Sequence, residues 1–254
     1  MLVQAGTNVP TPHYGEVPMN LNRRGFLIIS GSAIAVASLP FVARAGEKLK
    51  IGMIGSGRVG SALGNALVLA GHEVMFSSRH LEDDQSLAES IGAGASAGTP
   101  REAAAFGDVL FVAVPYSALP DVGEDLADLI KGKVIIDACN PFPNRDGEIA
   151  DWAREKGAGL ASAELLPGAL IVRAFNAIGS ARMGAAYQEP GAVGMPIAGD
   201  DAEAVAVASG LIHDIGYEPV LIGGLEMGRH LIPGTPLAGE HSAEEIRQIA
   251  AGLE

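Results

Sequence analysis

The stretch that most constrains the fold is residues 50–60, KIGMIGSGRVG, in which a short apolar strand runs into a Gly-x-Gly-x-x-Gly turn. An Ala- and Leu-rich segment that is typical of a helix follows at 61–70. In such a turn Gly55 permits a tight bend, Gly57 lets the main chain approach a pyrophosphate, and Gly60 lets helix and strand pack closely. The motif alone is weak in a chain with 34 glycines. Its place between a strand and a helix predicts a dinucleotide-binding loop.

The helix that begins in this loop offers unpaired N–H groups and the positive end of its dipole to a phosphate. We therefore predict that the whole loop binds the cofactor: Gly55, Ser56, Gly57, Arg58, Val59 and Gly60. Arg58 either faces the phosphates or is a solvated residue at the start of the helix. The alternative for the loop as a whole is a glycine-rich turn without a ligand.

Short apolar segments that are typical of strands alternate with segments that are typical of helices between residues 49 and 137. The expected strands are 49–54, 73–77, 93–97, 108–114 and 133–137, and the expected helices are 58–70, 83–91, 99–105 and 118–130. The run 108–114 is continuously apolar, as in strands that are buried on both faces of a parallel sheet. The alternation predicts an α/β fold of the Rossmann type, with a doubly wound, mainly parallel sheet.

The second half is less regular and adds strands to this core. We expect strands at 169–175, 195–198 and 217–222, and helices at 146–156, 202–215, 225–232 and 242–252. No internal repeat or linker divides the chain. Residues 46–254 are therefore expected to form one NAD(P)-binding domain with a C-terminal extension.

Ligands of doubly wound sheets bind at the carboxyl ends of the strands. Two further strand ends therefore join the glycine loop as predicted cofactor-binding segments: Ala113, Val114 and Pro115, and Asn140 and Pro141.

The end of the second strand indicates which nucleotide is bound. NAD-specific sites commonly have a carboxylate there, on the ribose 2′-hydroxyl. This chain has Ser77, Ser78 and Arg79 instead, which can bind a 2′-phosphate through charge-assisted hydrogen bonds. The sequence thus favours NADP(H), and the alternative is a solvated arginine at a strand end.

Residues 1–45 are predicted to be a targeting segment. Arg23-Arg24 precedes a moderately apolar run at 26–42, which resembles a twin-arginine export signal, and Ala43-Arg44-Ala45 matches a cleavage pattern. We expect cleavage before Gly46 and an exported, periplasmic protein with no stable membrane span. An uncleaved anchor is the alternative.

Composition excludes some function classes. A formal net charge of −13 argues against nucleic acid as a partner, because phosphate contacts need a basic face. The single cysteine, Cys139, excludes an intrachain disulfide, and no histidine pair has the spacing of metal ligands. We predict no metal site. A homodimer is compatible with the sequence, which leaves the oligomeric state open.

From residue 48 to about residue 232 the chain resembles the F420H2:NADP oxidoreductases, which are NADPH-dependent reductases of the deazaflavin coenzyme F420. The nucleotide-binding module of metalloreductases that carry a transmembrane haem domain is similar too. The resemblance is carried in order by residues 54–60, 70–74, 77–79, 113–115, 136–141, 173–179 and 198–202.

This resemblance implies that Ser78 and Arg79 hold the 2′-phosphate, and that Ala113–Pro115 and Asn140-Pro141 line the nicotinamide and its ribose. It also implies that Phe175-Asn176 lies on the wall near a flavin-like or F420 acceptor. Because the cofactor carries hydride chemistry, we predict no catalytic side chain. Two alternatives stay open: an NADPH-linked reductase of another small substrate, and a non-catalytic NADP-binding or redox-sensing protein.

Overall fold

The computed structural model describes residues 48–184 and 190–253. The predicted export signal and its cleavage site lie outside these residues. None of the helices in the described ranges is both long enough and apolar enough to cross a membrane.

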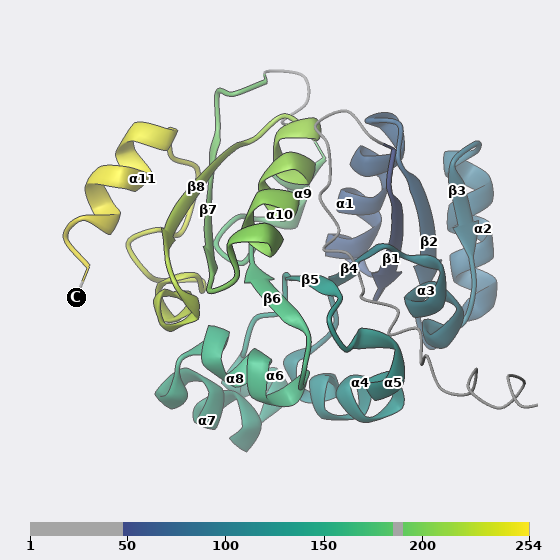
Figure 1. The fold of residues 1–254 in the computed structure, drawn as a ribbon, viewed down its shortest axis with the longest axis horizontal. Coiled ribbons are helices and arrows are strands. Elements are labelled where there is room, and N and C mark those ends of the chain that lie inside the picture. The colour runs from purple at the N-terminus through teal and green to yellow at the C-terminus, as the bar shows by residue number, and fades with distance from the viewer. Residues whose placement is uncertain (1–47, 185–189, 254) are drawn as a thin grey trace, which may run out of the picture. The chain divides into compact units, whose positions relative to one another are not determined.

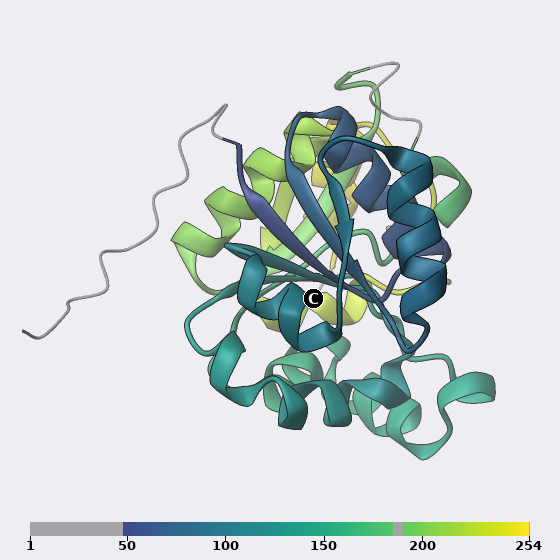
Figure 2. The ribbon, with the colours of Figure 1, turned by 90° about the vertical axis from the view of Figure 1, so that its right-hand side faces the viewer.

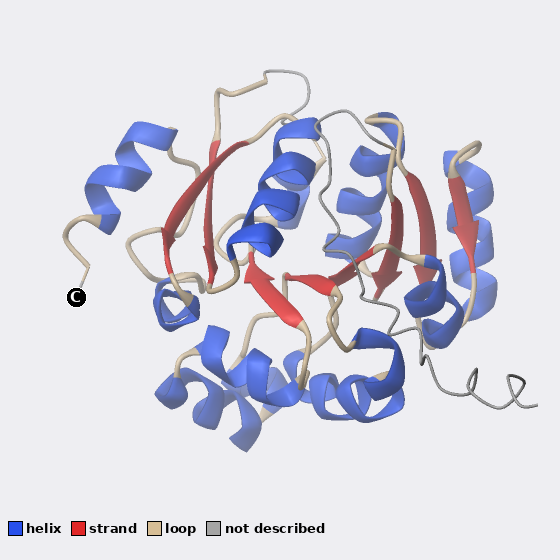
Figure 3. Ribbon diagram, viewed as in Figure 1, coloured by secondary structure: helices blue, strands red, loops and turns tan. Residues whose placement is uncertain are grey.

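One sheet of eight strands runs through the described domain, in the order β3-β2-β1-β4-β5-β6-β7-β8 (Figures 1 and 3). The strands from β1 to β6 are parallel, β7 is antiparallel to β6, and β8 is parallel to β7. This topology confirms the predicted Rossmann-type sheet with additional C-terminal strands. The strands are β1 Lys50–Ile54, β2 Glu73–Ser77, β3 Ala95–Ala97, β4 Val109–Val112, β5 Val134–Asp137, β6 Leu170–Arg173, β7 Gly194–Gly199 and β8 Glu218–Gly223.

Helices cover both faces of the sheet (Figure 2). The residues of α1 and α10 share one hydrophobic core, and those of α3, α4, α7 and α8 share the other. The helices are α1 Arg58–Leu69, α2 Leu81–Ile91, α3 Pro100–Phe106, α4 Leu119–Asp125, α5 Ala127–Ile130, α6 Pro143–Asp146, α7 Glu148–Lys156, α8 Ala158–Leu165, α9 Ser180–Met183, α10 Ala202–Asp214 and α11 Ala243–Ala250, with short 3-10 turns η1 Tyr116–Ala118 and η3 Leu225–His230.

Strand β4 explains why the sequence forms a sheet that is covered on two sides. All four of its residues are buried. Val109 and Phe111 belong to the core of α1 and α10, whereas Leu110 and Val112 belong to the other core. Successive side chains of a strand point to opposite faces, so a continuously apolar strand needs a helical layer on each side.

Some helices differ from the predictions. The expected helix 146–156 is α6 and α7, which are separated by Gly147 at φ +64°. The expected helix 118–130 is broken at Leu126, and α8 was not predicted. A capping box starts α3, with Thr99 and Glu102 each bonded to the other's main chain.

Because β7 is antiparallel to β6, Ala198 and Gly199 pair with Arg173 and Val172, and the start of β7 at Gly194 extends beyond the end of β6. The C-terminal tail returns to the edge where β6 ends. There the Gly239 N–H donates to the Ala177 carbonyl at 2.8 Å, and the Gly194 N–H donates to the His241 carbonyl at 2.8 Å. The tail, which lies beyond the expected nucleotide-binding core, thus becomes a neighbour of the loop after β6.

His72 ties three elements together at the opposite edge of the sheet. The Leu49 N–H donates to its Nδ1 at 3.2 Å, and its Nε2 lies 3.2 Å from Asp214 on α10. Because Nδ1 accepts, the proton of the neutral ring lies on Nε2 and is donated to Asp214. Burial lowers the pKa of His72, although the Asp214 carboxylate opposes this shift.

The lowered pKa of His72 predicts a loss of stability in acid. Below about pH 6.5 the unfolded chain binds a proton that the folded chain resists, so the free energy of unfolding falls as the pH drops towards the folded pKa. His72→Gln should reduce the difference between pH 7 and pH 5 by about 1.4 kcal/mol for each unit of the pKa shift. Urea titrations followed by circular dichroism measure it. His213→Gln, at an exposed position on α10, is the control and should keep the wild-type difference; an unchanged difference in His72→Gln contradicts the prediction.

Candidate functional site: the carboxyl ends of the parallel strands

The glycine loop has the geometry that its sequence predicts. Gly55 has φ +99°, and a Cβ there would lie 2.5 Å from the Ala113 carbonyl oxygen. A Cβ on Gly60 would lie 1.8 Å from the Gly55 carbonyl oxygen. Neither position has room for a side chain. The tight turn and the close packing of α1 on β1 therefore both require glycine.

Gly57 differs from the other two glycines. A Cβ on Gly57 would meet no atom within 4 Å, and the residue is exposed at the N-terminus of α1. No side chain caps this helix, and its first turn carries no acidic residue. The first amides of α1 are thus left for an anion. This loop fits the pyrophosphate of a dinucleotide.

The end of β2 orients its three predicted residues differently. Ser77 is fully buried and its hydroxyl donates to the Met53 carbonyl at 2.8 Å. It points into the sheet, which leaves its side chain no route to a ligand. Arg79 is exposed, and no partner for its guanidinium is found in the described part of the chain. Ser78 is half-buried beside it.

The ends of β4 and β5 lie next to the glycine loop. The Ala113 N–H donates to the Ile54 carbonyl at 2.8 Å, and the Ala138 N–H donates to the Val112 carbonyl at 2.9 Å. Ala113 and Val114 are half-buried and Pro115 is exposed, so this turn presents apolar residues at the carboxyl edge of the sheet. On the next turn, Asn140 is half-buried and Pro141 is buried. The structure therefore brings the predicted segments to one edge of the sheet.

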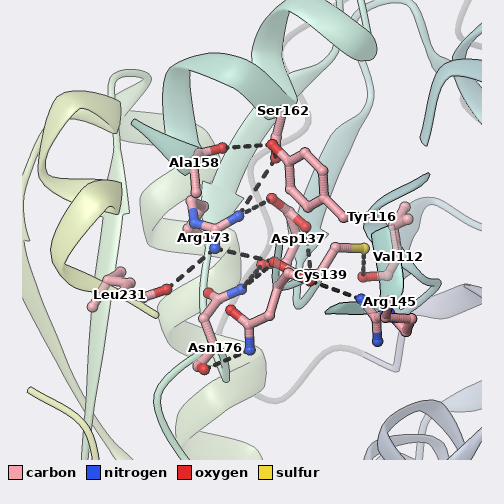
Figure 4. A network of polar contacts seen from close by, with 11 residues as sticks. Val112, Tyr116, Asp137, Cys139, Arg145, Ala158, Ser162, Arg173, Asn176 and Leu231 are labelled. Carbon is pink, nitrogen blue, oxygen red and sulfur yellow. Dashed lines mark hydrogen bonds and ion pairs between the residues drawn. The ribbon is translucent and has the colours of Figure 1, made fainter. Parts of the chain in front are cut away.

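A buried ion pair lies beneath this edge (Figure 4). Arg173, at the end of β6, donates to Asp137, at the end of β5, with Nη1 and Oδ2 2.5 Å apart, and neither side chain is exposed. The other Asp137 oxygen accepts the Cys139 N–H at 2.8 Å. Arg173 Nη2 donates to the carbonyls of Cys139 and Leu231. The pair thus fixes the turn after β5 and joins it to the segment that follows η3.

Two asparagines clamp the turns after β5 and β6 to each other (Figure 4). Asn176 donates to the carbonyls of Asp137 and Cys139, both at 3.1 Å, and Asn140 donates to the Asn176 carbonyl at 2.7 Å. These bonds hold the main chain of both turns.

Phe175 sets the direction of the turn after β6. Within the described ranges it is the non-glycine residue with a left-handed backbone, at φ +66°. Its side chain is 1% exposed and packs against Phe111 and Tyr217. Asn176 is also buried, at 2% exposure. The resemblance placed Phe175-Asn176 on the wall of the site, but both side chains point into the protein, because one fills the core and the other satisfies carbonyl groups.

Two ionisable side chains beside these turns, Cys139 and Tyr116, are held in their neutral forms. Burial raises the pKa of the Cys139 thiol, which is bonded to the Val112 carbonyl, and the Asp137 charge adds to this shift. Burial likewise raises the pKa of Tyr116, whose hydroxyl lies 3.1 Å from the Ala158 carbonyl and 3.1 Å from the Ser162 hydroxyl. Neither group is arranged to exchange protons with a substrate. The described residues include no cluster of three or more metal-ligating side chains.

Sequence reasoning missed one residue of the site, Asp84. This aspartate is 1% exposed and accepts hydrogen bonds from the hydroxyls of Ser56 and Ser78. It lies in the first turn of α2, where an acidic residue is usually solvated. The sequence signal that could have revealed Asp84 is the pair Ser56 and Ser78, which follow two neighbouring strands. A partly buried hydroxyl needs a hydrogen-bond acceptor, so two of them predict an acceptor nearby.

Two glycines of the loop, Gly57 and Gly60, can be tested separately. Gly57→Ala should keep the melting temperature, because a methyl group fits there, but should weaken NADPH binding at least tenfold by blocking the main-chain approach. Gly60→Ala should destabilise the fold itself, since its Cβ would overlap the Gly55 carbonyl. Differential scanning fluorimetry and calorimetric titration separate the two effects. Unchanged NADPH affinity in Gly57→Ala would be evidence against this loop as the pyrophosphate site.

The buried ion pair predicts that a nearly isosteric substitution of Asp137 strongly lowers the free energy of unfolding. Asp137→Asn leaves the Arg173 charge without a counter-charge in the core, which should lower the free energy of unfolding by about 3–5 kcal/mol. Asp128→Asn breaks the exposed pair with Arg101 and should have little effect. Urea unfolding at pH 7 measures both. Equal effects of the two substitutions would be inconsistent with this role of the buried pair.

Comparison with known proteins agrees with this geometry. Residues 50–141, from β1 to the turn after β5, match the family described as NADP oxidoreductase, coenzyme F420-dependent. The F420-dependent NADP reductase of Methanothermobacter thermautotrophicus is 30% identical over 205 residues, which cover 74% of this chain and 87% of the reductase. The crystal structure of a hypothetical protein, SMa0349, from Sinorhizobium meliloti has a TM-score of 0.66 at 27% identity, covering 76% of this chain and 93% of that one.

A second kind of relative is a larger protein. The metalloreductase STEAP3 of Rattus norvegicus is 31% identical over 210 residues, which cover 82% of this chain and 40% of the rat protein. The chain thus spans less than half the length of that relative. Together with the match over 87% of the Methanothermobacter enzyme, these comparisons show that the chain belongs to the F420-dependent NADP reductase family and is an NADP(H)-dependent oxidoreductase.

Proposed function

We propose that this protein transfers a hydride between NADPH and a deazaflavin of the F420 type. The family supports NADP(H) and an oxidoreductase reaction. The identity of the acceptor is our inference from the residues around the strand ends.

NADPH is proposed to bind across the carboxyl edge of β1, β2, β4 and β5, and it supplies the hydride when bound. The amides of Gly57 and of the first turn of α1 receive the pyrophosphate, with Ser56, Val59 and Arg58 around it. The Arg79 guanidinium receives the 2′-phosphate, which then lies beside the Ser78 hydroxyl. Ala113, Val114 and Pro115 on one side, and Asn140 and Pro141 on the other, receive the nicotinamide and its ribose. The clamped turns after β5 and β6 keep this surface rigid, which favours alignment of two rings.

One observation favours a ring acceptor over an imine or a carbonyl. Hydride transfer to those substrates needs a proton donor beside the nicotinamide. Here Tyr116 and Cys139 donate to main-chain carbonyls inside the protein, and their pKa values are raised. Hydride transfer to a flavin-like ring depends mainly on alignment and exclusion of water.

The acceptor is identified by mixing the purified protein with NADPH and F420, FMN or a ferric chelate, and following absorbance at the NADPH band. The proposal expects F420 to be reduced fastest. Faster reduction of FMN or the ferric chelate would show that F420 is not the preferred acceptor. Tight NADPH binding without turnover on any acceptor would favour a non-catalytic NADP-binding or redox-sensing role.

The proposed contact of Arg79 with the 2′-phosphate predicts a selective defect. Arg79→Glu should weaken NADPH binding by at least 100-fold and leave NADH nearly unchanged, because only NADPH carries the phosphate. Arg247→Glu, on α11 beside β7 and β8, makes the same charge change away from the glycine loop and should affect neither nucleotide. Calorimetric titration gives the four dissociation constants. Equal losses for NADPH and NADH in Arg79→Glu would refute the contact.

We also propose that residues 1–45 direct export by a twin-arginine route, since that route carries folded proteins and would suit a protein exported with its nucleotide bound. N-terminal sequencing of the mature protein tests this proposal. A start at Gly46 agrees with cleavage, and a retained Arg23-Arg24 pair contradicts it.

A further inference from the structure

Asp84 is a buried carboxylate to which the proposed hydride transfer assigns no role. It is 1% exposed, and none of the ion pairs between described residues includes it. Its hydrogen-bond donors are two neutral hydroxyls, those of Ser56 and Ser78. A carboxylate is seldom buried without a cation, and the N-terminus of α2 offers only a partial positive charge. This arrangement puts a carboxylate without a cationic partner among the described residues inside the site.

The position of this charge follows from its two partners. Ser56 belongs to the glycine loop and Ser78 to the end of β2, so Asp84 lies between the two predicted phosphate-binding segments. Its Oδ2 is 2.8 Å from Ser78 Oγ. A 2′-phosphate in contact with Ser78 would therefore lie only two hydrogen-bond lengths from the carboxylate. Charges of the same sign at such a distance repel each other when little water separates them.

The hydroxyl protons add a second effect. A serine hydroxyl has a single proton to donate. For Ser78 the nearest acceptor is the Asp84 carboxylate at 2.8 Å, whereas the His80 carbonyl lies at 3.4 Å. The His80 N–H in turn donates to Ser78 Oγ at 3.0 Å. The oxygen then offers a lone pair to the site, which suits the 2′-hydroxyl of NAD(H) and not the oxygens of a 2′-phosphate.

We propose that Asp84 is a specificity-determining residue that reduces the preference of the site for NADP(H) over NAD(H). It does so by repelling the 2′-phosphate and by turning the Ser78 hydroxyl into an acceptor. Arg79 acts in the opposite sense, so the nucleotide preference is set by the balance of the two residues. This inference rests on the proposed binding of NADPH at Ser78 and Arg79.

Asp84→Asn tests the inference with almost no change of shape. The amide removes the negative charge, still accepts a hydrogen bond from one serine, and donates to the other. When it donates to Ser78, the Ser78 proton is released towards the phosphate. The ratio of the NAD+ to the NADP+ dissociation constant should rise at least tenfold, or about 1.4 kcal/mol. Most of the change should come from tighter NADP+ binding.

The matched control is Asp83→Asn, which removes the same charge from the neighbouring, exposed residue of α2 and should change the ratio less than threefold. Both variants are titrated calorimetrically with NADP+ and NAD+ as the full chain. An unchanged ratio in Asp84→Asn, or equal shifts in the two variants, overturns the role of Asp84. If the wild-type protein binds neither nucleotide, the proposed function itself has failed, which is a different result.

A second substitution covers the case in which Asp84→Asn does not fold. Ser78→Ala removes the acceptor oxygen and leaves Asp84 in place. On this proposal NAD+ binding weakens by a larger factor than NADP+ binding. A larger loss for NADP+ would mean that Ser78 donates to the phosphate, and would overturn the inference.

Discussion

The site depends on the close contact between the first turn of α1 and the end of β1. The contact exists because Gly60 has no side chain where the Gly55 carbonyl lies. As a result, α1 begins directly at the edge of the sheet, and no described side chain caps the amides that follow Gly57. The neighbouring strands β2 and β4 then pair with β1 in register, which brings Ser78 and Ala113 to the same edge. The sheet edge at which we propose that a dinucleotide binds follows from this one steric requirement and the order of the strands.

Local sequence signals were sufficient for most of the fold. The central strands were predictable because continuous apolar runs such as 109–112 fit only a sheet covered on both faces. The start of α3 was predictable because a capping box involves residues three apart, and Asp201 caps α10 for a similarly local reason. The positive φ of Gly55 was predictable because the turn permits few other residues. The position of the candidate site followed from these elements.

What the sequence did not predict depends on distant partners or on small residues. Helix α8 was missed because its sequence, AGLASAEL, has no clear polar face. Asp84 was missed because one of its partners, Ser56, lies 28 residues away. The buried orientations of Ser77 and Phe175 depend on packing across strands, which local patterns do not encode. The acidic residue that bears on nucleotide choice thus comes from α2, and the strand end itself has none.

The return of the C-terminal tail to the end of β6 has a consequence for how the two sides of the site can change during evolution. The nucleotide half is built from a continuous stretch between β1 and the turn after β5, whereas the wall after β6 is backed by the distant tail through the Gly239–Ala177 hydrogen bond. The two halves are therefore encoded by separate parts of the chain. Substitutions or length changes in the tail can remodel the wall after β6, where we propose that the acceptor binds, while the glycine loop is inherited unchanged.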